Sequence, residues 1–190
     1  MNKPKIKVIL GSIREGRAGE KVSHWSMNTL QSDTSAELSL LDLRDYPLPM
    51  FADAVGPAMR QGPHPIPLVR KWLDEIASAD GLIIITPEYN HSFSSALKNA
   101  LDYIAREAAD KPVGFVSYGG ASGGIRAVEQ LRQVVGEQRM YDVRDQVAIP
   151  MIWAAFDETG KLQNTEMHEK NAKLMFDKVV ELANKLRKQN

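Results

Sequence analysis

Cysteine, net charge and long apolar segments are all missing from this sequence. Without cysteine the chain has no disulfide, no thiolate metal site and no cysteine nucleophile, a composition that suits a reducing compartment. Basic and acidic residues number 24 each and form no basic block, which argues against binding to nucleic acid through positive charge. No apolar run approaches the roughly 18 residues that span a membrane, and the first residues fit no signal peptide. We therefore expect a soluble cytoplasmic protein that binds neither nucleic acid nor membrane.

The chain has 190 residues, of which 43% are hydrophobic and 25% charged, as is typical of one globular domain covering residues 1–190. Its apolar residues alternate between the period of strands and that of helices, which predicts a parallel sheet covered by helices in a three-layer, doubly wound α/β sandwich. The predicted strands are Lys5–Leu10, Ala36–Leu43, Gly81–Thr86, Val113–Tyr118 and Gln146–Ile149, the last with an uncertain start. The predicted helices are Glu20–Gln31, Ile66–Ala79, Ser94–Arg106, Gly124–Val135 and His168–Lys188.

Ligands of such sheets bind at the carboxyl ends of the strands, so the loops after the first, third and fourth strands are the candidate sites. The first loop runs from Gly11 to Gly19 and opens a helix, where free backbone N–H groups favour an anion. Its glycines allow close approach of a phosphate, to which Ser12, Arg14 and Arg17 can donate. The loop contains neither a Walker A sequence nor G-x-G-x-x-G, which disfavours the P-loop and dinucleotide-binding interpretations.

The loop after the third strand begins Pro87-Glu88-Tyr89-Asn90. Tyr89 offers a planar apolar surface and Asn90 an amide, a combination that suits a flat heteroaromatic ring. Downstream, Lys98 and Asp102 stand four residues apart on a predicted helix, a spacing typical of a surface ion pair rather than of catalysis. Glu88 is expected either to pair with a neighbouring subunit or to face water.

Three motifs together resemble the NAD(P)H-dependent FMN reductase family, whose members have the flavodoxin-like fold. The motifs are Gly11-Ser12-Ile13-Arg14, Pro87-Glu88-Tyr89-Asn90 followed by Leu97-Lys98-Asn99 and Asp102, and Ser117-Tyr118-Gly119-Gly120. The resemblance implies a single FMN-binding domain whose five strands lie in the order 2-1-3-4-5. It also implies transfer of hydride from NADPH or NADH through FMN to a small acceptor such as a quinone, a flavin, an azo compound or a metal oxyanion.

The resemblance implies the following cofactor-binding residues: Ser12, Arg14 and Arg17 at the FMN phosphate, Pro87, Glu88, Tyr89 and Asn90 at the flavin ring, and Ser117, Tyr118, Gly119 and Gly120 beside it. No catalytic side chain is required, because the chemistry takes place on the flavin. A homodimer or homotetramer is implied as well, with His91–Phe93 and the Trp153 region as candidate interface segments. The chain departs from the family pattern at Arg17, where many members have serine, and at Ser94, where many have proline.

The sequence is compatible with three alternatives. Gly120-Ala121-Ser122-Gly123-Gly124 matches the G-x-S-x-G motif of serine hydrolases, with Asp157 and His168 following in the expected order, but Ser122 lies four residues past the predicted strand end. An electron-carrier flavodoxin shares the fold, yet carriers of that kind are typically strongly acidic. A metal enzyme is disfavoured because the four histidines are scattered without ligand spacing.

A proline-rich segment separates the second predicted strand from the next helix. Six of the ten prolines lie there, namely Pro47, Pro49, Pro57, Pro63, Pro65 and Pro67. A long connection of this composition is either a lid, binding loop or interface arm, or a plain surface loop.

Overall fold

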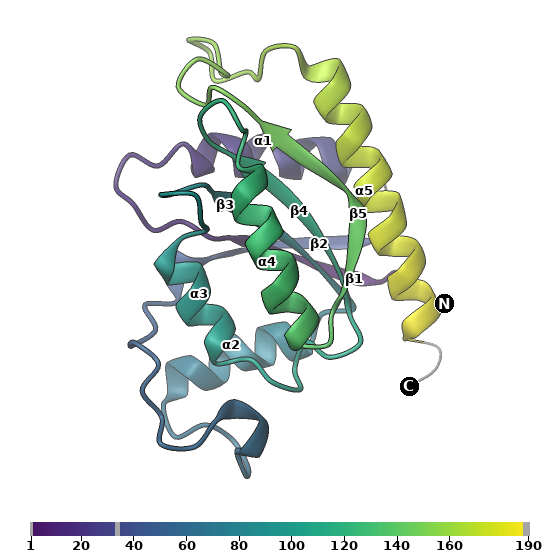
Figure 1. Ribbon diagram of the computed structural model, residues 1–190. Helices are drawn as coiled ribbons and strands as arrows, with labels where there is room; N and C mark the ends of the chain where they lie inside the picture. Colours follow the sequence, from purple (N-terminus) through teal and green to yellow (C-terminus); the bar gives the residue numbers. More distant parts are fainter. Residues whose placement is uncertain (1, 33–34, 188–190) are drawn as a thin grey trace.

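The computed structural model (Figure 1) describes residues 2–32 and 35–187 and contains a five-stranded parallel sheet in the order β2-β1-β3-β4-β5. The strands are β1 (Lys5–Leu10), β2 (Glu37–Asp42), β3 (Gly81–Pro87), β4 (Pro112–Tyr118) and β5 (Tyr141–Ile149). The predicted fold and strand order are thus confirmed. The chain reverses its direction of winding between β1 and β3, which places a switch point at their carboxyl ends.

Helices cover both faces of the sheet. On one face lie α1 (Gly19–Gln31) and α5 (Thr165–Leu186), and on the other α2 (Pro67–Ala77), α3 (Ser95–Asp102) and α4 (Ile125–Glu137), with short 3₁₀ turns η1 (Leu43–Asp45) and η2 (Pro57–Met59) between β2 and α2. The alternating side chains of β3 divide between two cores, Leu82 and Ile84 packing under α2, α3 and α4 and Ile83 and Ile85 under α1 and α5. A strand that is apolar on both faces is therefore required at the centre.

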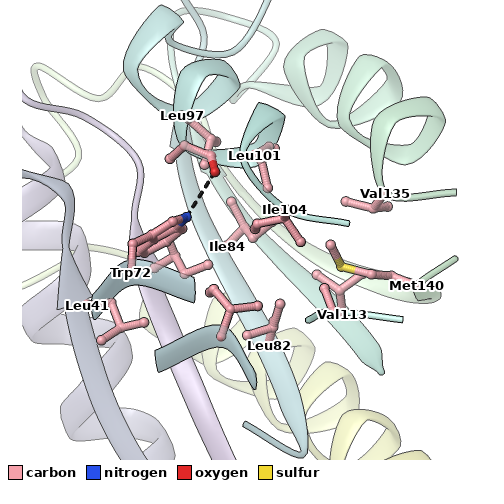
Figure 2. Packing of buried hydrophobic residues seen from close by; sticks show 14 of the residues in the cluster. Leu41, Trp72, Leu82, Ile84, Leu97, Leu101, Ile104, Val113, Val135 and Met140 are labelled. Carbon is pink, nitrogen blue, oxygen red and sulfur yellow. Dashed lines mark hydrogen bonds between the residues drawn. The ribbon is translucent and has the colours of Figure 1, made fainter. Parts of the chain in front are cut away.

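The core beneath α2 and α3 is built around Trp72, which is fully buried (Figure 2). Its ring packs with Leu82, Ile84 and Leu101, and its indole Nε1 donates a hydrogen bond of 2.9 Å to the backbone oxygen of Ala100. A buried indole N–H needs such a partner to offset its lost hydration. The bond therefore fixes α3 relative to α2.

The predicted helix over residues 94–106 is wrong at its carboxyl end, because α3 stops at Asp102. The oxygens of Ala100 and Leu101 accept from the side chains of Trp72 and Gln138, and the N–H of Ala105 donates to the carboxylate of Glu107. These two long-range hydrogen bonds and the local one replace the backbone bonds that would continue the helix.

Two other boundaries differ from the sequence prediction by three residues or more, and the remaining ones by at most two residues. Strand β5 begins at Tyr141 rather than near Gln146, because its first half is an edge with charged side chains that hide the alternation. Helix α5 begins at Thr165, three residues before the predicted start, and the predicted end at Lys188 lies outside the described residues.

The proline-rich segment packs against α3. The side chain of Asn99 accepts from the N–H of Phe51 at 2.8 Å and donates to the oxygen of Pro49 at 2.8 Å, while the Tyr103 hydroxyl donates to the same oxygen at 3.1 Å. The segment is thus anchored by side chains of the Leu97-Lys98-Asn99 stretch and its helix. Within residues 2–32 and 35–187, no helix combines the length and apolarity needed to cross a membrane.

Candidate functional site

The loops after β1, β3 and β4 meet at the carboxyl edge of the sheet, at the switch point between β1 and β3. The N–H of Gly11 donates to the oxygen of Ile85 at 2.9 Å, which holds the start of the first loop against the end of β3. A Cβ at Gly11 would lie 3.0 Å from that oxygen and 3.0 Å from Leu97, so a side chain there would crowd this approach. The Ser94 hydroxyl caps α3 and also bonds the oxygen of Gly11.

Two arginines hold the carbonyl groups of the first loop. Arg17 donates to the oxygen of Ser12, and Arg44 donates to those of Ile13 and Arg14. No acceptor in the described part of the chain receives the backbone N–H groups of Ser12, Ile13 and Arg14. Because the C=O and N–H of one peptide point in opposite directions, the arginines leave a row of N–H groups free for an anion.

Arg17 is buried in an ion pair with Asp42, at the end of β2, and it also reaches Glu20 at 3.3 Å. Burial by itself would raise the pKa of Asp42, but hydrogen bonds from Arg17 and from the N–H of Arg44 outweigh it and lower that pKa. The Glu20 carboxylate also accepts from Arg44 at 2.7 Å. The guanidinium of Arg17 is therefore engaged within the protein, and its predicted direct contact with a phosphate stays a prediction.

Ser12, Arg14 and Tyr89 come together above this loop. The hydroxyls of Ser12 and Tyr89 are 2.7 Å apart, and the exposed guanidinium of Arg14 stacks 5.4 Å above the Tyr89 ring centre. The Tyr118 hydroxyl is buried in the same place, beside the Ser12 side chain, and forms no well-aligned hydrogen bond with the described residues. Burial and the neighbouring Tyr89 raise the pKa of Tyr118, so its hydroxyl keeps the proton that it can donate.

Asn90 and His91 form the tip of a two-residue turn in the third loop. Tyr89 and Ser92 exchange backbone hydrogen bonds of 2.7 and 3.0 Å, and both tip residues have positive φ, 50° and 68°. Asparagine tolerates this conformation better than most residues, and the turn leaves the Asn90 side chain exposed. Pro87 ends β3 directly before this loop.

Glu88 joins the third loop to the fourth. Its carboxylate accepts from the Ser122 hydroxyl at 2.9 Å and from Arg126 at 2.7 Å. Desolvation would raise its pKa, but these donors lower it, so the group is a carboxylate at neutral pH. Glu88 thus pairs within its own chain, and the expectation of a neighbouring subunit or water as its partner is wrong.

The fourth loop is shaped by its own backbone. Ser117 is buried and donates to the oxygen of Gly123 at 2.8 Å, while Gly119 packs against Glu88. Gly124 has a φ of 87°, and a Cβ there would lie 2.7 Å from that of Ser117, so glycine is required for the turn into α4. Gly120 is bonded to the segment after β5, and the side chain of Tyr118 points under the first loop rather than along the fourth.

Most of the predicted site residues therefore meet at one edge, but their surroundings differ. Ser12, Arg14, Tyr89 and the Tyr118 hydroxyl converge on the free N–H groups of the first loop, a donor set that fits a phosphate. Asn90, Gly119 and Gly120 belong to the two loops beside it, and Pro87 ends the strand before one of them. Arg17, Glu88 and Ser117 have partners within the protein.

The serine-hydrolase constellation does not form. Ser122 contacts Glu88 and Arg126, Asp157 bonds within its own turn, and His168 packs edge-on against Trp25. The three members of the predicted triad therefore do not contact one another in the described structure. Ser122 therefore lacks the histidine that serves as the general base in a serine-hydrolase triad.

Sequence reasoning missed Arg44 and Asp42, which shape the first loop from the end of β2. Lys98 and Asp102, in contrast, form the predicted helix-surface ion pair at 2.7 Å. A signal for Asp42 was present, because an acidic residue ending a strand beside β1 must lie near the first loop. Arg44 gave no such signal, since its contacts are made to backbone oxygens.

The family model described as NADPH-dependent FMN reductase matches residues 4–154. The chain is 37% identical over 137 residues to an NAD(P)H-dependent FMN reductase of Schizosaccharomyces pombe, covering 72% of this chain and 68% of that one. It is 34% identical over 137 residues to an NAD(P)H:quinone oxidoreductase of Solanum tuberosum, covering 69% and 68%. FerB, a flavoenzyme NAD(P)H:(acceptor) oxidoreductase from Paracoccus denitrificans, shares the fold with a TM-score of 0.74 at 20% identity, over 96% of this chain and 98% of its own. The aligned sequences span about two thirds of each curated relative. The chain belongs to the NADPH-dependent FMN reductase family.

Proposed function

We propose that this protein is an FMN-dependent oxidoreductase that uses NAD(P)H to reduce a small acceptor. The observation that carries the proposal is the convergence of free N–H groups at Ser12–Arg14 with the orphaned Tyr118 hydroxyl at the β1–β3 switch point. In a member of this family, such a donor set is suited to the phosphate of FMN. When bound, FMN would supply the hydride chemistry, and the transfer from NAD(P)H to the flavin needs no acid or base from the chain.

In this proposal some residues contact FMN directly, and others hold the loops that contact it. The N–H groups of the first loop, Arg14 and the Tyr118 hydroxyl hold the phosphate, while Arg17 and Arg44 keep the loop in shape from behind. The loops at Pro87–Asn90 and Ser117–Gly120 hold the two edges of the flavin ring. Glu88 ties these loops together through Ser122 and Arg126, so that the distance between them stays constant.

A quinone is the acceptor that we propose first. The potato relative is named a quinone oxidoreductase, and a Burkholderia relative, 33% identical over 121 residues, is named a 2-hydroxy-1,4-benzoquinone reductase. Flavins, azo compounds and metal oxyanions are the other acceptor classes to test. We also propose a homodimer or homotetramer and a cytoplasmic location, which light scattering of the purified protein and cell fractionation would test.

An absorption spectrum tests the central proposal. We expect the protein, purified or incubated with FMN, to show a flavin band that bleaches when NADPH or NADH is added without oxygen and returns when a quinone follows. A colourless protein that binds no added FMN would contradict the proposal. Hydrolase activity with a fluorophosphonate label at Ser122 would support the alternative that the geometry disfavours.

A further inference from the structure

The segment that follows β5 forms an additional wall of the candidate site. The N–H of Met151 donates to the oxygen of Gly120 at 2.9 Å, and that of Ile152 donates to the oxygen of Gly119 at 3.0 Å. These bonds attach residues 150–152 to the loop that we assign to the flavin edge. The segment is therefore held at a fixed distance from that loop rather than free to move.

Trp153 is presented by this segment. The N–H of Ala154 donates to the oxygen of Met151 at 2.8 Å, closing a turn with Trp153 inside it, and Met151 has a φ of 48°. A left-handed methionine is strained and persists only where its neighbours are held, a feature that is concentrated at functional sites. The rim of the Trp153 ring would lie 3.7 Å from a Cβ at Gly120, so the ring stands directly beside the fourth loop.

The indole of Trp153 is largely exposed to solvent. The residue is 70% exposed, whereas the chain buries Trp72 completely. No cation or aromatic ring stacks on it in the described part of the chain. Exposure of a large planar apolar surface to water is unfavourable, whereas flat aromatic molecules stack on such a surface favourably.

A protein–protein interface explains the exposure of Trp153 less well than a stacked aromatic ligand does. A stable interface buries about 800 Å² on each partner, and Trp153 with Met151 supplies only a fraction of such an area. The hydrogen bonds to Gly119 and Gly120 also direct the ring toward the proposed flavin loops rather than away from them.

We propose that Trp153 is a wall of the acceptor subsite and selects planar aromatic acceptors, quinones above all, over compact inorganic ones. The inference rests on the proposed function and adds the substrate class of that same site. Stacking requires a flat π-surface on both partners, which a quinone has and an octahedral metal complex lacks. The residue therefore determines specificity and does not take part in the chemistry.

The variants Trp153→Ala and Trp153→Phe test this inference, with menadione as the planar acceptor and ferricyanide as the compact one. In the FMN-loaded protein without NAD(P)H, we expect calorimetry to show menadione binding weakened about tenfold by W153A and largely restored by W153F. In turnover, W153A is expected to raise KM for menadione and to leave KM for ferricyanide and the FMN content unchanged. Met59→Ala is the matched control, because Met59 is 71% exposed but lies in η2, at the opposite end of the molecule from the loop after β5 (Figure 1).

Equal effects of W153A on both acceptors, or no effect on either, would overturn the inference. A lower molecular mass of W153A in light scattering would also overturn it, because it would assign Trp153 to a subunit interface. These results differ from failure of the proposed function, in which the wild-type protein itself neither holds FMN nor oxidises NAD(P)H.

Discussion

Arg14 and Arg17 are three residues apart in the first loop, yet their surroundings are opposite. Arg14 is exposed above the ring of Tyr89, so its charge is available to a ligand. Arg17 is buried against Asp42, and its removal would leave that carboxylate without its main partner. The sequence predicts both arginines at the phosphate, whereas in the structure Arg14 is open to a ligand and Arg17 supports the loop from within the protein.

Arg14→Ala is expected to weaken FMN binding by about 1.5–3 kcal/mol, the value of a hydrogen bond to a charged group. Titration of the flavin fluorescence measures the change in Kd. Riboflavin, which lacks the phosphate, is the matched ligand, and its affinity should be the same in both proteins. A parallel loss for riboflavin would mean that Arg14 contacts the ring and not the phosphate.

Arg44→Ala tests whether the loop carbonyls need a partner. Arg44 holds the oxygens of Ile13 and Arg14 from outside the site, so its loss should allow the loop to rotate and should cost about 1 kcal/mol of FMN binding, roughly fivefold in Kd. Again the loss should be specific to FMN over riboflavin. Arg60→Ala is the control, because Arg60 pairs with Glu107 instead, and an equal loss in that variant would contradict the assignment.

Helices α2 and α3 are joined by one buried hydrogen bond, from the Trp72 indole to the oxygen of Ala100 (Figure 2). Trp72→Phe keeps an aromatic ring but removes the donor and leaves a small cavity. We expect a loss of about 2–3 kcal/mol in the free energy of unfolding, measured by urea denaturation at pH 7. Trp153→Phe replaces an exposed tryptophan in the same way and should leave stability unchanged. A similar loss in both variants would show that the buried bond contributes little.

The carboxyl end of α3 also explains why the predicted element was too long. Leu101 and Ile104 continue the apolar spacing of a helix, and that spacing was the basis of the prediction. The helix stops because Trp72 and Gln138 occupy the carbonyls that would propagate it. Neither donor is near in sequence, so no local pattern contains this information.

The stability of the whole molecule should depend on Lys111 above neutral pH. Its Nζ donates to the oxygens of Ile76 and Ala77 at 2.6 and 2.8 Å, at the end of α2, and burial lowers its pKa to about 8 despite Asp80 and Glu107. Between about pH 8 and the ordinary lysine pKa of about 10.4, the unfolded chain binds more protons than the folded one. The free energy of unfolding should therefore gain a contribution that rises with pH across this window.

Lys111→Met removes this contribution and the two hydrogen bonds. Urea denaturation at pH 7.5, 8.5 and 9.5 should show a less positive slope of the free energy of unfolding with pH in the variant than in the wild-type protein. The exposed Lys98 provides the control variant, Lys98→Met, which should keep the wild-type slope. Identical slopes in all three proteins would mean that Lys111 has the same proton affinity in the folded and unfolded chains.

The sequence by itself determined the fold class and the three loops of the candidate site, and its resemblance to a known family supplied the strand order. Apolar periodicity is a local property, and the winding rules of parallel sheets leave few arrangements once the elements are known. The Gly11–Arg14 and Pro87–Asn90 motifs therefore located the carboxyl edge correctly.

Only the tertiary structure decided what each side chain does there. Arg17 pairs with Asp42 and Glu88 with Arg126 across 25 and 38 residues, and the free N–H groups of the first loop exist because Arg44 holds its carbonyls. Hydrogen bonds and ion pairs depend on distances of about 3 Å between groups that are remote in the chain. Such distances are set by packing, and the sequence order does not contain them.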